Sequence, residues 1–498
     1  MAASRMAARI TSSEMDHVTR CLRRCRLPLL GVLALGCRTD VDPTAPGSDG
    51  PDVAPFTGTT ADTGTTVPPL VVTCDAPEHA LRATCRWTGL DGTATLTVEG
   101  VASPFSLAGA DGALRVLGLR PETSYPWRVE GGPEAAEGAF TTPALPTGAL
   151  VRVAVQGAPS MPLVGLKSPC GDASTYVVVD VGPDPEPTSE VSTTTTARPG
   201  PDIHRVVAYE DVARHQSGFV DGVSFGEDGT VLALSAFPGG VVELDRTGER
   251  VTSWPEDAFF GPPHHDVFRR DGRTYVLVQD FTEGVFLDAV QVFGTDGEQE
   301  GLWRLADHID PLPDARGYEK GDYSHANSIW VDDVGDWYLS SRHLSAVFKI
   351  AGLDAPDAGA VRWVLAGDPE EIRIDGTLEL LGEESFVRQH NVHLTPDGHL
   401  AMFDNRRYFP ELSRMLWLRV DEAAGTAEVE QAWTLPEHCP FQGGAWTTAA
   451  GTALATCAAQ QVAFEFVPDA PDPVARVGIE CASGAQGYIP RMVPLEAW

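Results

Sequence analysis

The chain has 498 residues, 43% of them hydrophobic and 21% charged, so it can bury a large core and two or three domains are expected. Its formal net charge of -34 argues against nucleic acid and against an anionic membrane surface as binding partners. The 50 glycines and 39 prolines are typical of a β-rich chain with many turns.

The N-terminal segment 1–36 is basic, unlike the rest of the chain. Several arginines precede the apolar run Leu27–Gly36, and Cys37 follows it. This pattern predicts a secretory signal peptide, and Gly36-Cys37 resembles a lipobox, so we expect a lipid on Cys37. An ordinary secretory signal or an uncleaved anchor is the alternative, although the run is too short to span a bilayer. The predicted location is the periplasm or cell envelope, with the lipid anchor as the only membrane contact.

Two segments separate this signal from the main part of the chain. Residues 37–68 are rich in Pro, Gly, Thr and Asp and have too few apolar residues for a core, so they read as a disordered tether. Residues 69–145 contain short runs of alternating apolar and polar residues, which predict a small β-sandwich. The stretch from Leu117 to Tyr125 resembles the corner of fibronectin type III domains, in which a tyrosine packs and hydrogen-bonds.

The remaining residues, 146–498, contain a repeated unit of strand, Asp/Gly turn and strand. Clear copies begin at Asp221, His265, His325 and His390, and a fainter copy begins at Gly443. One or two further strand-like segments follow each copy. Four strands per unit, at spacings of 44 to 65 residues, are typical of the blades of a β-propeller.

A sixth blade is expected from segments 163–166 and 175–180, which precede the first copy. The C-terminal segment 491–495 would complete this blade and close the ring. The predicted fold is therefore all-β: a six-bladed β-propeller preceded by a small β-sandwich that resembles immunoglobulin and fibronectin type III domains.

The six cysteines that follow Cys37 form an even set, which suggests disulfides in an exported chain. Fifteen connectivities are compatible with six cysteines. We favour Cys74–Cys85 and Cys439–Cys457, because each pair would lie on neighbouring strands.

Three histidines begin the first strand of successive repeats: His265, His325 and His390. In a propeller the first strand of each blade lines the central channel, and the second runs back beside it. Arg342 ends the second strand of the blade that starts at His325, so all four side chains should meet at one mouth of the channel. A lone histidine is usually structural, whereas three at equivalent positions favour a site. A three-histidine zinc site is an alternative, but Arg342 would repel a cation, so no metal is predicted.

The motifs around these residues resemble those of the arylsulfate sulfotransferase family. Ser324-His-Ala-Asn-Ser-Ile329 and Leu339-Ser-Ser-Arg-His343 look like its signature, and Arg388-Gln-His-Asn-Val392 and His264-His-Asp-Val267 resemble its two other histidine segments. The similarity covers residues 146–498, and the sandwich matches the usual N-terminal domain of the family.

The resemblance implies a ping-pong transfer of a sulfuryl group from a phenolic sulfate ester to a phenol through a sulfohistidine, without phosphoadenosine phosphosulfate or another cofactor. His390 matches the nucleophile of the family, and His265, His325 and Arg342 match the other active-site residues. Either His264 or His265 fills the first position; we prefer His265 because it aligns with His390 across the repeats.

These residue types suit the chemistry. The planar fork of Arg342 can hold two sulfonate oxygens, and neutral His390 can attack sulfur. His325 or His265, as an imidazolium, can protonate the leaving phenolate.

Other residues are expected to support these groups. Asn327 and His264 are expected to bind or orient the substrate. Asp280 and Asp404 end second strands on the same face and could set histidine tautomers. The stretch Gly222–Gly226 fits a GxSxG motif but lies within a predicted strand, which is the wrong setting for a hydrolase nucleophile.

Two other functions remain open. A non-catalytic surface propeller could bind sulfated or phenolic ligands, and a sulfate-ester hydrolase would use water as the acceptor. The predicted partners are small phenols and aryl sulfates. The sequence does not indicate an oligomeric state, although a homodimer is one option, nor does it identify the physiological donor and acceptor.

Overall fold

A computed structural model describes residues 69–131, 135–171, 174–182, 205–236, 239–282, 284–310, 321–368, 374–406, 411–485 and 487–498. The expected signal peptide, the lipid on Cys37 and the tether 37–68 therefore lie outside the described residues. In the described part, no helix has the length and apolar character needed to cross a membrane. The only helical pieces there are short 3-10 turns: η2 (Thr147–Ala149), η3 (Val212–Arg214), η4 (Glu256–Ala258) and η5 (Leu305–Asp307).

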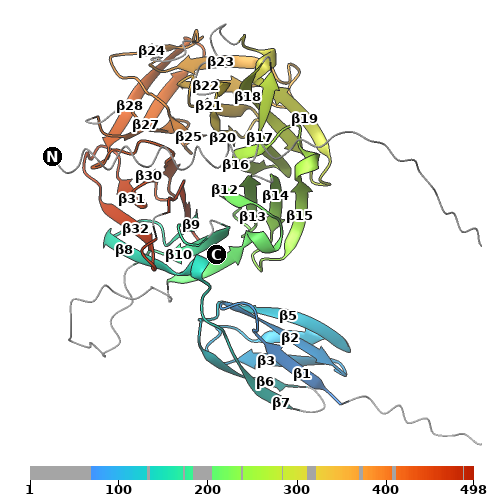
Figure 1. Ribbon diagram of the computed structural model, residues 1–498. Coiled ribbons are helices and arrows are strands. Elements are labelled where there is room, and N and C mark those ends of the chain that lie inside the picture. Colours follow the sequence, from blue (N-terminus) through green and yellow to red (C-terminus); the bar gives the residue numbers. More distant parts are fainter. Residues whose placement is uncertain are drawn as a thin grey trace, which may run out of the picture. The chain divides into compact units, whose positions relative to one another are not determined.

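The first folded part consists of two antiparallel sheets whose strands lie between Val71 and Thr141 (Figure 1). One sheet has the order β1 (Val71–Asp75), β2 (Arg82–Thr88), β5 (Asp111–Leu117). The other has the order β4 (Phe105–Ala108), β3 (Thr93–Val98), β6 (Ser124–Glu130), β7 (Ala136–Thr141). Alternate residues of β6 are buried, and Tyr125 among them accepts a hydrogen bond from the backbone N–H of Arg120 at 2.6 Å. The tyrosine contact expected from the sequence is thus present.

Six further sheets lie in the described residues from Val151 onward, and they confirm the β-propeller class. Five strands from the N-terminal part and the C-terminus form the start and end of the ring: β8 (Val151–Gly157), β9 (Leu163–Lys167), β10 (Thr175–Asp180), β11 (Val206–Asp211) and β33 (Met492–Leu495). Three four-stranded sheets follow: β12 (Phe219–Phe225), β13 (Val231–Ala236), β14 (Gly240–Leu244), β15 (Arg250–Pro255); β16 (Pro263–Arg270), β17 (Arg273–Thr282), β18 (Val285–Phe293), β19 (Gln299–Arg304); and β20 (Ala326–Val331), β21 (Trp337–Ser341), β22 (Ala346–Ile350), β23 (Val361–Ala366). The last two sheets contain β24 (Glu379–Leu381), β25 (His390–Leu394), β26 (Leu400–Asp404), β27 (Arg414–Asp421), β28 (Thr426–Thr434); and β29 (Gly444–Thr447), β30 (Ala453–Cys457), β31 (Val462–Phe466), β32 (Ala475–Cys481).

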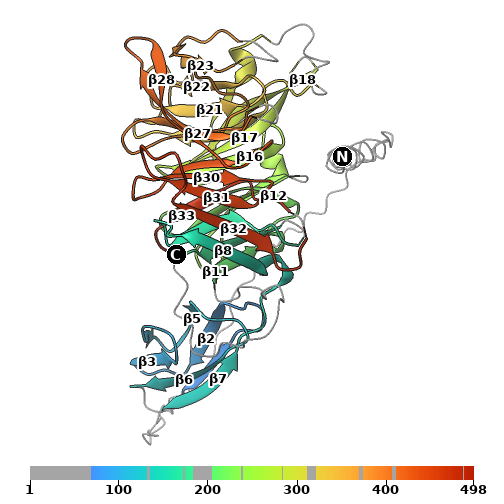
Figure 2. The same ribbon diagram turned by 90° about the vertical axis from the view of Figure 1, so that its left-hand side faces the viewer.

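The innermost strands of neighbouring sheets contact one another around a central channel. Strand β12 lies against β16, β16 against β20, β20 against β25, β25 against β29, and β29 against β33, while β9 lies against β12. Figure 1 shows β12, β16 and β20 toward the centre and β15, β19 and β23 at the rim, and Figure 2 gives the side view. Large apolar side chains fill the space between neighbouring sheets; Trp337, Phe348 and Trp433 are examples, and all three are fully buried. This packing fixes the position of each inner strand.

The ring is closed in three ways that join segments far apart in the sequence. Strand β33 pairs with β9, as predicted, and β8 pairs with β32. The disulfide Cys170–Cys481 links the same two ends of the ring. The favoured pairs Cys74–Cys85 and Cys439–Cys457 are also present, so both disulfide predictions are confirmed.

Each inner strand begins at the end of the channel where its neighbouring second strand ends, because the two are antiparallel. Four inner strands carry a β-bulge near this start: in β12 after Val220, in β16 after Pro263, in β20 after Ala326 and in β25 after His390. A bulge turns a side chain away from the regular alternation of the strand. The histidine motifs thus fall where the backbone can aim them out of the sheet.

Candidate active site

We call the end of the channel where the inner strands begin the histidine mouth; it holds His264, His265, His325, Arg342 and His390. His265 lies near the start of β16, and His325 directly precedes β20. The centroids of their rings are 4.9 Å apart. Both residues have left-handed backbone angles, with φ of 57° and 48°. Such strain in non-glycine residues is common where side chains must be aimed at a site.

Close packing of the backbone beneath His265 depends on a glycine. A Cβ atom added at Gly222 on β12 would lie 2.5 Å from the carbonyl oxygen of His265. Gly222 therefore allows β12 and β16 to approach at this mouth. The preceding residue, Asp221, accepts a hydrogen bond from the backbone N–H of His265 at 2.7 Å, which holds the bulged segment in place.

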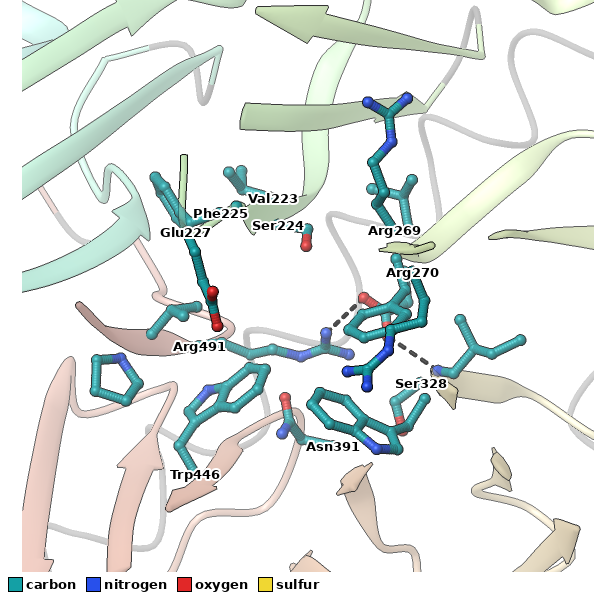
Figure 3. Close-up of a pocket in the computed structure, with 18 of the residues that line it drawn as sticks. Val223, Ser224, Phe225, Glu227, Arg269, Arg270, Ser328, Asn391, Trp446 and Arg491 are labelled. Carbon is teal, nitrogen blue, oxygen red and sulfur yellow. Dashed lines mark hydrogen bonds and ion pairs between the residues drawn. The ribbon is translucent and has the colours of Figure 1, made fainter. Parts of the chain in front are cut away.

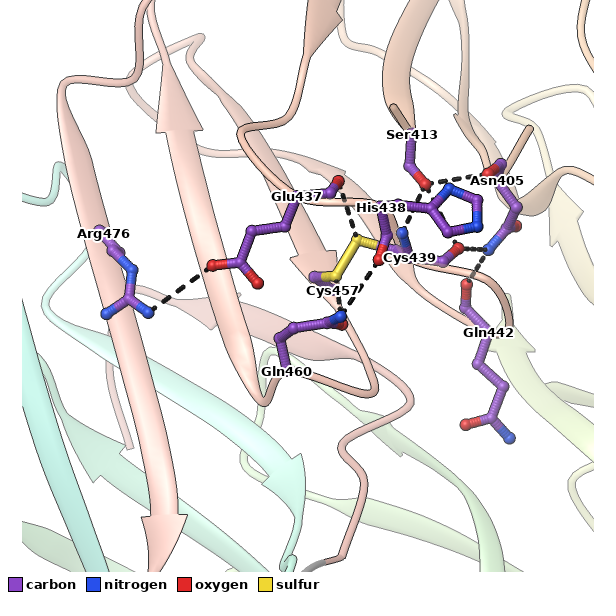
Figure 4. The surroundings of a disulfide bond; sticks show 9 residues. All are labelled: Asn405, Ser413, Glu437, His438, Cys439, Gln442, Cys457, Gln460 and Arg476. Carbon is purple, nitrogen blue, oxygen red and sulfur yellow. Dashed lines mark hydrogen bonds and ion pairs between the residues drawn. A yellow bond between two sulfur atoms is a disulfide. The ribbon is translucent and has the colours of Figure 1, made fainter. Parts of the chain in front are cut away.

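The ring of His390 is oriented at Nδ1 by the side chain of Asn405 and by the carbonyl oxygen of Arg388, which lies 3.0 Å away. The oxygen Oδ1 of Asn405 lies 2.6 Å from Nδ1 of His390. The amide nitrogen of Asn405 donates to the carbonyl oxygens of Cys439 and Gln442, at 2.8 and 2.7 Å, so its oxygen must face the histidine. Figure 4 shows Asn405 beside Gln442 and the disulfide Cys439–Cys457. Nδ1 of His390 is therefore the protonated nitrogen, and Nε2 keeps its lone pair.

His390 is also held in its neutral form. Burial and the positive charge of Arg342 lower the pKa of His390 well below its usual value, and His265 and His325 act in the same direction. A neutral imidazole with a free Nε2 lone pair is the form that can attack an electrophilic sulfur. The backbone N–H of Arg342 donates to the carbonyl oxygen of His325 at 3.1 Å, and the rings of His265 and His325 are 4.9 Å apart, so these three residues lie together at the mouth where β25 begins with His390.

Asp322 and His343 hold the groups around His325. Nδ1 of His325 lies 2.5 Å from Oδ2 of Asp322, so it donates to the carboxylate. The rings of His325 and His343 are 4.5 Å apart. Nδ1 of His343 lies 2.8 Å from the carbonyl oxygen of Asp322, and its Nε2 lies 2.5 Å from Nη1 of Arg342. His343 thereby accepts from the guanidinium and fixes its direction.

The adjacent histidines His264 and His265 form a hydrogen-bonded pair with different charges. Burial opposes ionisation of His264, but Asp288, 3.1 Å from its Nε2, raises the pKa of His264 above its usual value. Burial lowers the pKa of His265 to about 3, against the opposing effect of Asp221. Their Nδ1 atoms are 2.8 Å apart. Protonated His264 thus donates to Nδ1 of His265, which leaves a proton on Nε2 of His265.

The carboxylates that orient these rings are not those expected from the sequence. Asp280 accepts from Arg304 at 2.9 Å, and Asp404 accepts from Arg414 at 2.8 Å, so neither sets a histidine tautomer. Asp280 on β17 is paired with Arg304 two strands away on β19, and Asp404 on β26 is paired with Arg414, which lies opposite it on β27. Asp288, Asp322 and Asn405 fill that role instead. Asn405 directly follows Asp404, so the prediction was wrong by one residue in this blade.

Asn327 lies deep in the channel wall. Its side chain is 1% exposed, and Nδ2 donates to the carbonyl oxygen of Gln389 at 2.7 Å. The amide therefore joins the inner strands of two neighbouring blades. Its Oδ1 is buried and has no hydrogen-bond partner among the described residues, and substrate binding by Asn327 stays a prediction.

A cation is disfavoured at this mouth. Ligand atoms of Asp322, His325 and His343 lie within 4.8 Å of one another, the spacing of a possible metal group. Both ring nitrogens of His343 are already engaged, one of them by the guanidinium of Arg342. The positive charge of the Arg342 guanidinium, 2.5 Å from Nε2 of His343, repels a metal ion and attracts an anion. The arrangement fits a sulfonate better than zinc.

Exposed phenylalanines gather at the histidine mouth. Among the described residues, five phenylalanines are between 37% and 65% exposed: Phe219, Phe260, Phe281, Phe286 and Phe441. Each lies at the start of an inner strand, in the loop before it, or in the hairpin that ends the second strand. Of these, Phe281 and Phe286 contact each other, with ring centroids 5.0 Å apart. Exposed aromatic side chains near a polar site are typical of a ligand-binding site. This rim suits an aromatic substrate.

Sequence comparison gives one family for this region. Residues 203–435 match the family model described as Arylsulfotransferase (ASST). That span contains all five residues that define the histidine mouth. No curated protein matches the chain.

Several solved structures have a backbone that partly superposes on that of this chain. A protein of unknown function from Bacteroides caccae has 11% identity and a TM-score of 0.42, and covers 68% of this chain and 100% of its own. A catalytically inactive virginiamycin B lyase from Staphylococcus aureus has 8% identity and a TM-score of 0.37, with 65% and 89% covered. The β-propeller domain of Cps50 (Swd1) from Myceliophteria thermophila has 12% identity and a TM-score of 0.36, with 71% and 88% covered. The propeller class of this chain rests on its own strand order.

Proposed function

Residues 203–435 match the arylsulfotransferase family model, and from this premise we propose that the chain transfers a sulfuryl group from a phenolic sulfate ester to a phenol through a sulfohistidine at His390. The family match supports aryl sulfotransferase activity in general. The observation that carries the finer proposal is the hydrogen bond between Nδ1 of His390 and Asn405, which leaves Nε2 free to attack. Because the donor in this proposal is a phenolic sulfate ester, the reaction does not use phosphoadenosine phosphosulfate.

In the first half-reaction Nε2 of His390 forms a bond to sulfur while the bond from sulfur to the aryl oxygen breaks. Charge develops on the leaving oxygen and on the sulfonate oxygens, as in phosphoryl transfer. The planar guanidinium of Arg342, held by His343, can bind two of those sulfonate oxygens. Binding of this kind is strongest where charge develops, so it lowers the barrier to transfer.

The leaving phenolate takes a proton from Nε2 of His265 in this proposal. His264 replaces that proton by transfer across the 2.8 Å contact between the two Nδ1 atoms. In the second half-reaction the oxygen of the acceptor phenol bonds to sulfur, its proton returns to His265, and His390 leaves as a neutral imidazole. His325, with Nδ1 bound to Asp322, is the second candidate for this proton transfer. A positioned acid or base of this kind typically contributes about 10²- to 10⁴-fold in rate.

The test is release of nitrophenol from 4-nitrophenyl sulfate, with and without added phenol. We expect release that depends on phenol and that is lost in His390→Asn. With a ³⁵S-labelled donor, acid-labile label should appear on His390 of the wild type. The matched control is His399→Asn in the hairpin that follows His390, where the ring binds Glu430 on the outside of the blade.

The outcomes separate this proposal from the other functions. Undiminished activity in His390→Asn would overturn the assignment of the nucleophile. Sustained release without phenol, beyond the single equivalent that forms the sulfohistidine, would indicate a hydrolase. Ligand binding without any release would indicate a non-catalytic propeller.

Export with a lipid on Cys37 is part of the same proposal. Three disulfides within the described residues support an oxidising compartment. Mass spectrometry of the mature N-terminus tests the anchor: a diacylated or triacylated Cys37 is expected, and an unmodified Cys37 or cleavage elsewhere would contradict it.

A further inference from the structure

A cavity of about 600 Å³ opens at the opposite end of the channel, where the inner strands end (Figure 3). We call this end the far mouth. Its wall includes one half-buried aromatic side chain from each of four inner strands: Phe225, Phe268, Trp330 and Trp446. The rings of Phe268 and Trp330 are 4.7 Å apart and form a continuous aromatic surface. Such a wall suits a flat ring as a ligand.

The far mouth is separated from the histidine mouth by Arg491. Its guanidinium donates to Asp266 at 2.6 Å and to the carbonyl oxygen of Asn327 at 2.7 Å, and so bridges two inner strands. Arg491 lines both this cavity and the small space beside His265. Figure 3 shows its side chain crossing the middle of the cavity. A ligand at the far mouth would therefore occupy a site of its own.

One buried acceptor in the cavity has no donor. Asn391 is 3% exposed, and its Nδ2 donates to the carbonyl oxygen of Ala445 at 2.5 Å. Its Oδ1 is buried and has no hydrogen-bond partner within the described part of the chain. Figure 3 shows this oxygen directed toward Arg491, inside the ring of aromatic side chains. A ligand hydroxyl placed there would satisfy it and recover the free energy of the missing hydrogen bond.

The charges around the cavity disfavour an anion. The three arginines that line it are already paired: Arg269 with Glu243, Arg270 with Asp333 and Arg491 with Asp266. The other charged residues of the lining are the carboxylates Glu227, Asp228 and Asp271. A neutral aromatic ligand with a hydrogen-bond donor fits this combination, whereas an aryl sulfate does not.

We propose that the far mouth is a second binding site, which takes a neutral phenol and excludes its sulfate ester. The aromatic wall and Asn391 define a small aromatic ligand with a hydroxyl group, and the choice of a phenol among these rests on the proposed function. Phenol is both the acceptor and the leaving product of that reaction. The site therefore binds the phenol, and not the sulfated partner, at a distance from the transfer chemistry.

The experiment uses the full-length His390→Asn protein, which should not turn over, and 4-fluorophenol observed by ¹⁹F NMR. Two bound signals are expected, one for each mouth. Trp446→Leu and Phe268→Leu should raise the dissociation constant that belongs to one of these signals by about threefold to tenfold, since each substitution removes an aromatic contact. Phe281→Leu, the same substitution at the histidine mouth, should leave that signal unchanged. Fluorobenzene and phenyl sulfate should fail to displace the probe from the far mouth, because one lacks the hydroxyl and the other is anionic.

Three results would overturn the proposal: a single bound signal that responds only to Phe281→Leu, displacement by fluorobenzene as effective as by phenol, or displacement by phenyl sulfate. Should either substitution unfold the chain, anomalous density of 4-bromophenol in crystals of the His390→Asn protein decides the same question. Its absence from the cavity would also overturn the proposal. If wild type shows no sulfuryl transfer but the far-mouth signal remains, the proposed function fails while the second site stands.

Discussion

Oδ1 of Asn405 accepts a hydrogen bond from Nδ1 of His390 at 2.6 Å, and the amide of Asn405 is itself held by two backbone carbonyls. An amide oxygen can only accept, so it selects one tautomer of the ring. A carboxylate at this place would do the same but would also raise the pKa of His390 and favour its unreactive, protonated form. The amide therefore gives both the right tautomer and a neutral ring.

Replacing Asn405 by Ala should lower kcat for aryl sulfate transfer by about 10- to 100-fold, because the ring loses the shorter of its two hydrogen bonds at Nδ1 and keeps only the one to the carbonyl oxygen of Arg388. KM for the donor should change little, since Asn405 does not face the substrate. Asn405→Asp should instead move the acid limb of the pH–rate profile to higher pH. Steady-state kinetics across pH measure both effects. Equal losses with unshifted pH profiles in the two variants would show that Asn405 has only a structural role.

His265→Gln should slow transfer from phenyl sulfate much more than from 4-nitrophenyl sulfate. Phenolate is a strong base that needs a proton as it leaves, whereas nitrophenolate leaves well without one. A loss of about 10²- to 10⁴-fold is expected for phenyl sulfate. The matched variant is Asp322→Asn, which removes the hydrogen-bond partner of His325 and acts on His264 only through the loss of a more distant charge than that of Asp288. If Asp322→Asn shows the stronger dependence on the leaving group, His325 is the proton donor instead.

Arg342→Lys should lower kcat/KM even though the charge is kept. Lysine cannot present two parallel N–H donors to a sulfonate, and its flexible stem would not be fixed by His343. His343→Ala should produce a smaller loss of the same kind, because the guanidinium remains but is no longer held at Nη1. Donor KM and kcat are measured separately for both variants. A His343→Ala protein with wild-type parameters would show that the contact does not position Arg342.

The pH–rate profile should be broad, with its limbs set by different histidines. The pKa of His390 is lowered by burial and by Arg342, so the nucleophile stays neutral as pH falls through 6.5 and the acid limb should appear well below that value. The pKa of His264 is raised by Asp288, so the charged proton relay persists at neutral pH and is lost as pH rises through that raised value. Measurement of kcat/KM from pH 4 to 9 checks this. An acid limb at pH 6.5 would contradict the neutral state assigned to His390.

Much of the histidine mouth could be predicted from the repeats. The equivalent positions of His265, His325 and His390, and of Arg342 at the end of a second strand, are set by the strand order alone. The two favoured disulfides were also predictable, because strand neighbours bring Cys74 to Cys85 and Cys439 to Cys457.

The supporting residues were harder to predict. Asp288 lies on a third strand, where the repeat gives no reason to expect a contact with His264. Asp322 lies three residues before His325 and precedes β20, outside the repeated unit, so the repeat gives no reason to expect it beside that ring. The choice between Asp404 and Asn405 depends on which way one side chain turns at the end of β26, and a single sequence does not contain that information. The far-mouth cavity depends on side chains whose burial only the packed ring reveals.

The disulfide Cys439–Cys457 should matter for catalysis as well as for stability. Cys439 presents its carbonyl oxygen to Asn405, and its N–H donates to Ser413 at 2.8 Å, so the crosslink fixes the loop that orients the support of His390. Replacing both cysteines by serine opens a loop of sequence separation 18, which typically costs about 3 kcal/mol of unfolding free energy.

The matched control is the double serine variant of Cys74 and Cys85, which removes a disulfide of sequence separation 11 from the two-sheet part. Both variants should unfold at lower denaturant concentration than wild type. Only the Cys439/Cys457 variant should also lose kcat under conditions where it stays folded, because only that loop reaches Asn405. Denaturant titration and transfer kinetics on the same samples separate the two effects. Equal kcat in both folded variants would show that hydrogen bonds to Cys439 and Gln442 hold Asn405 without help from the crosslink.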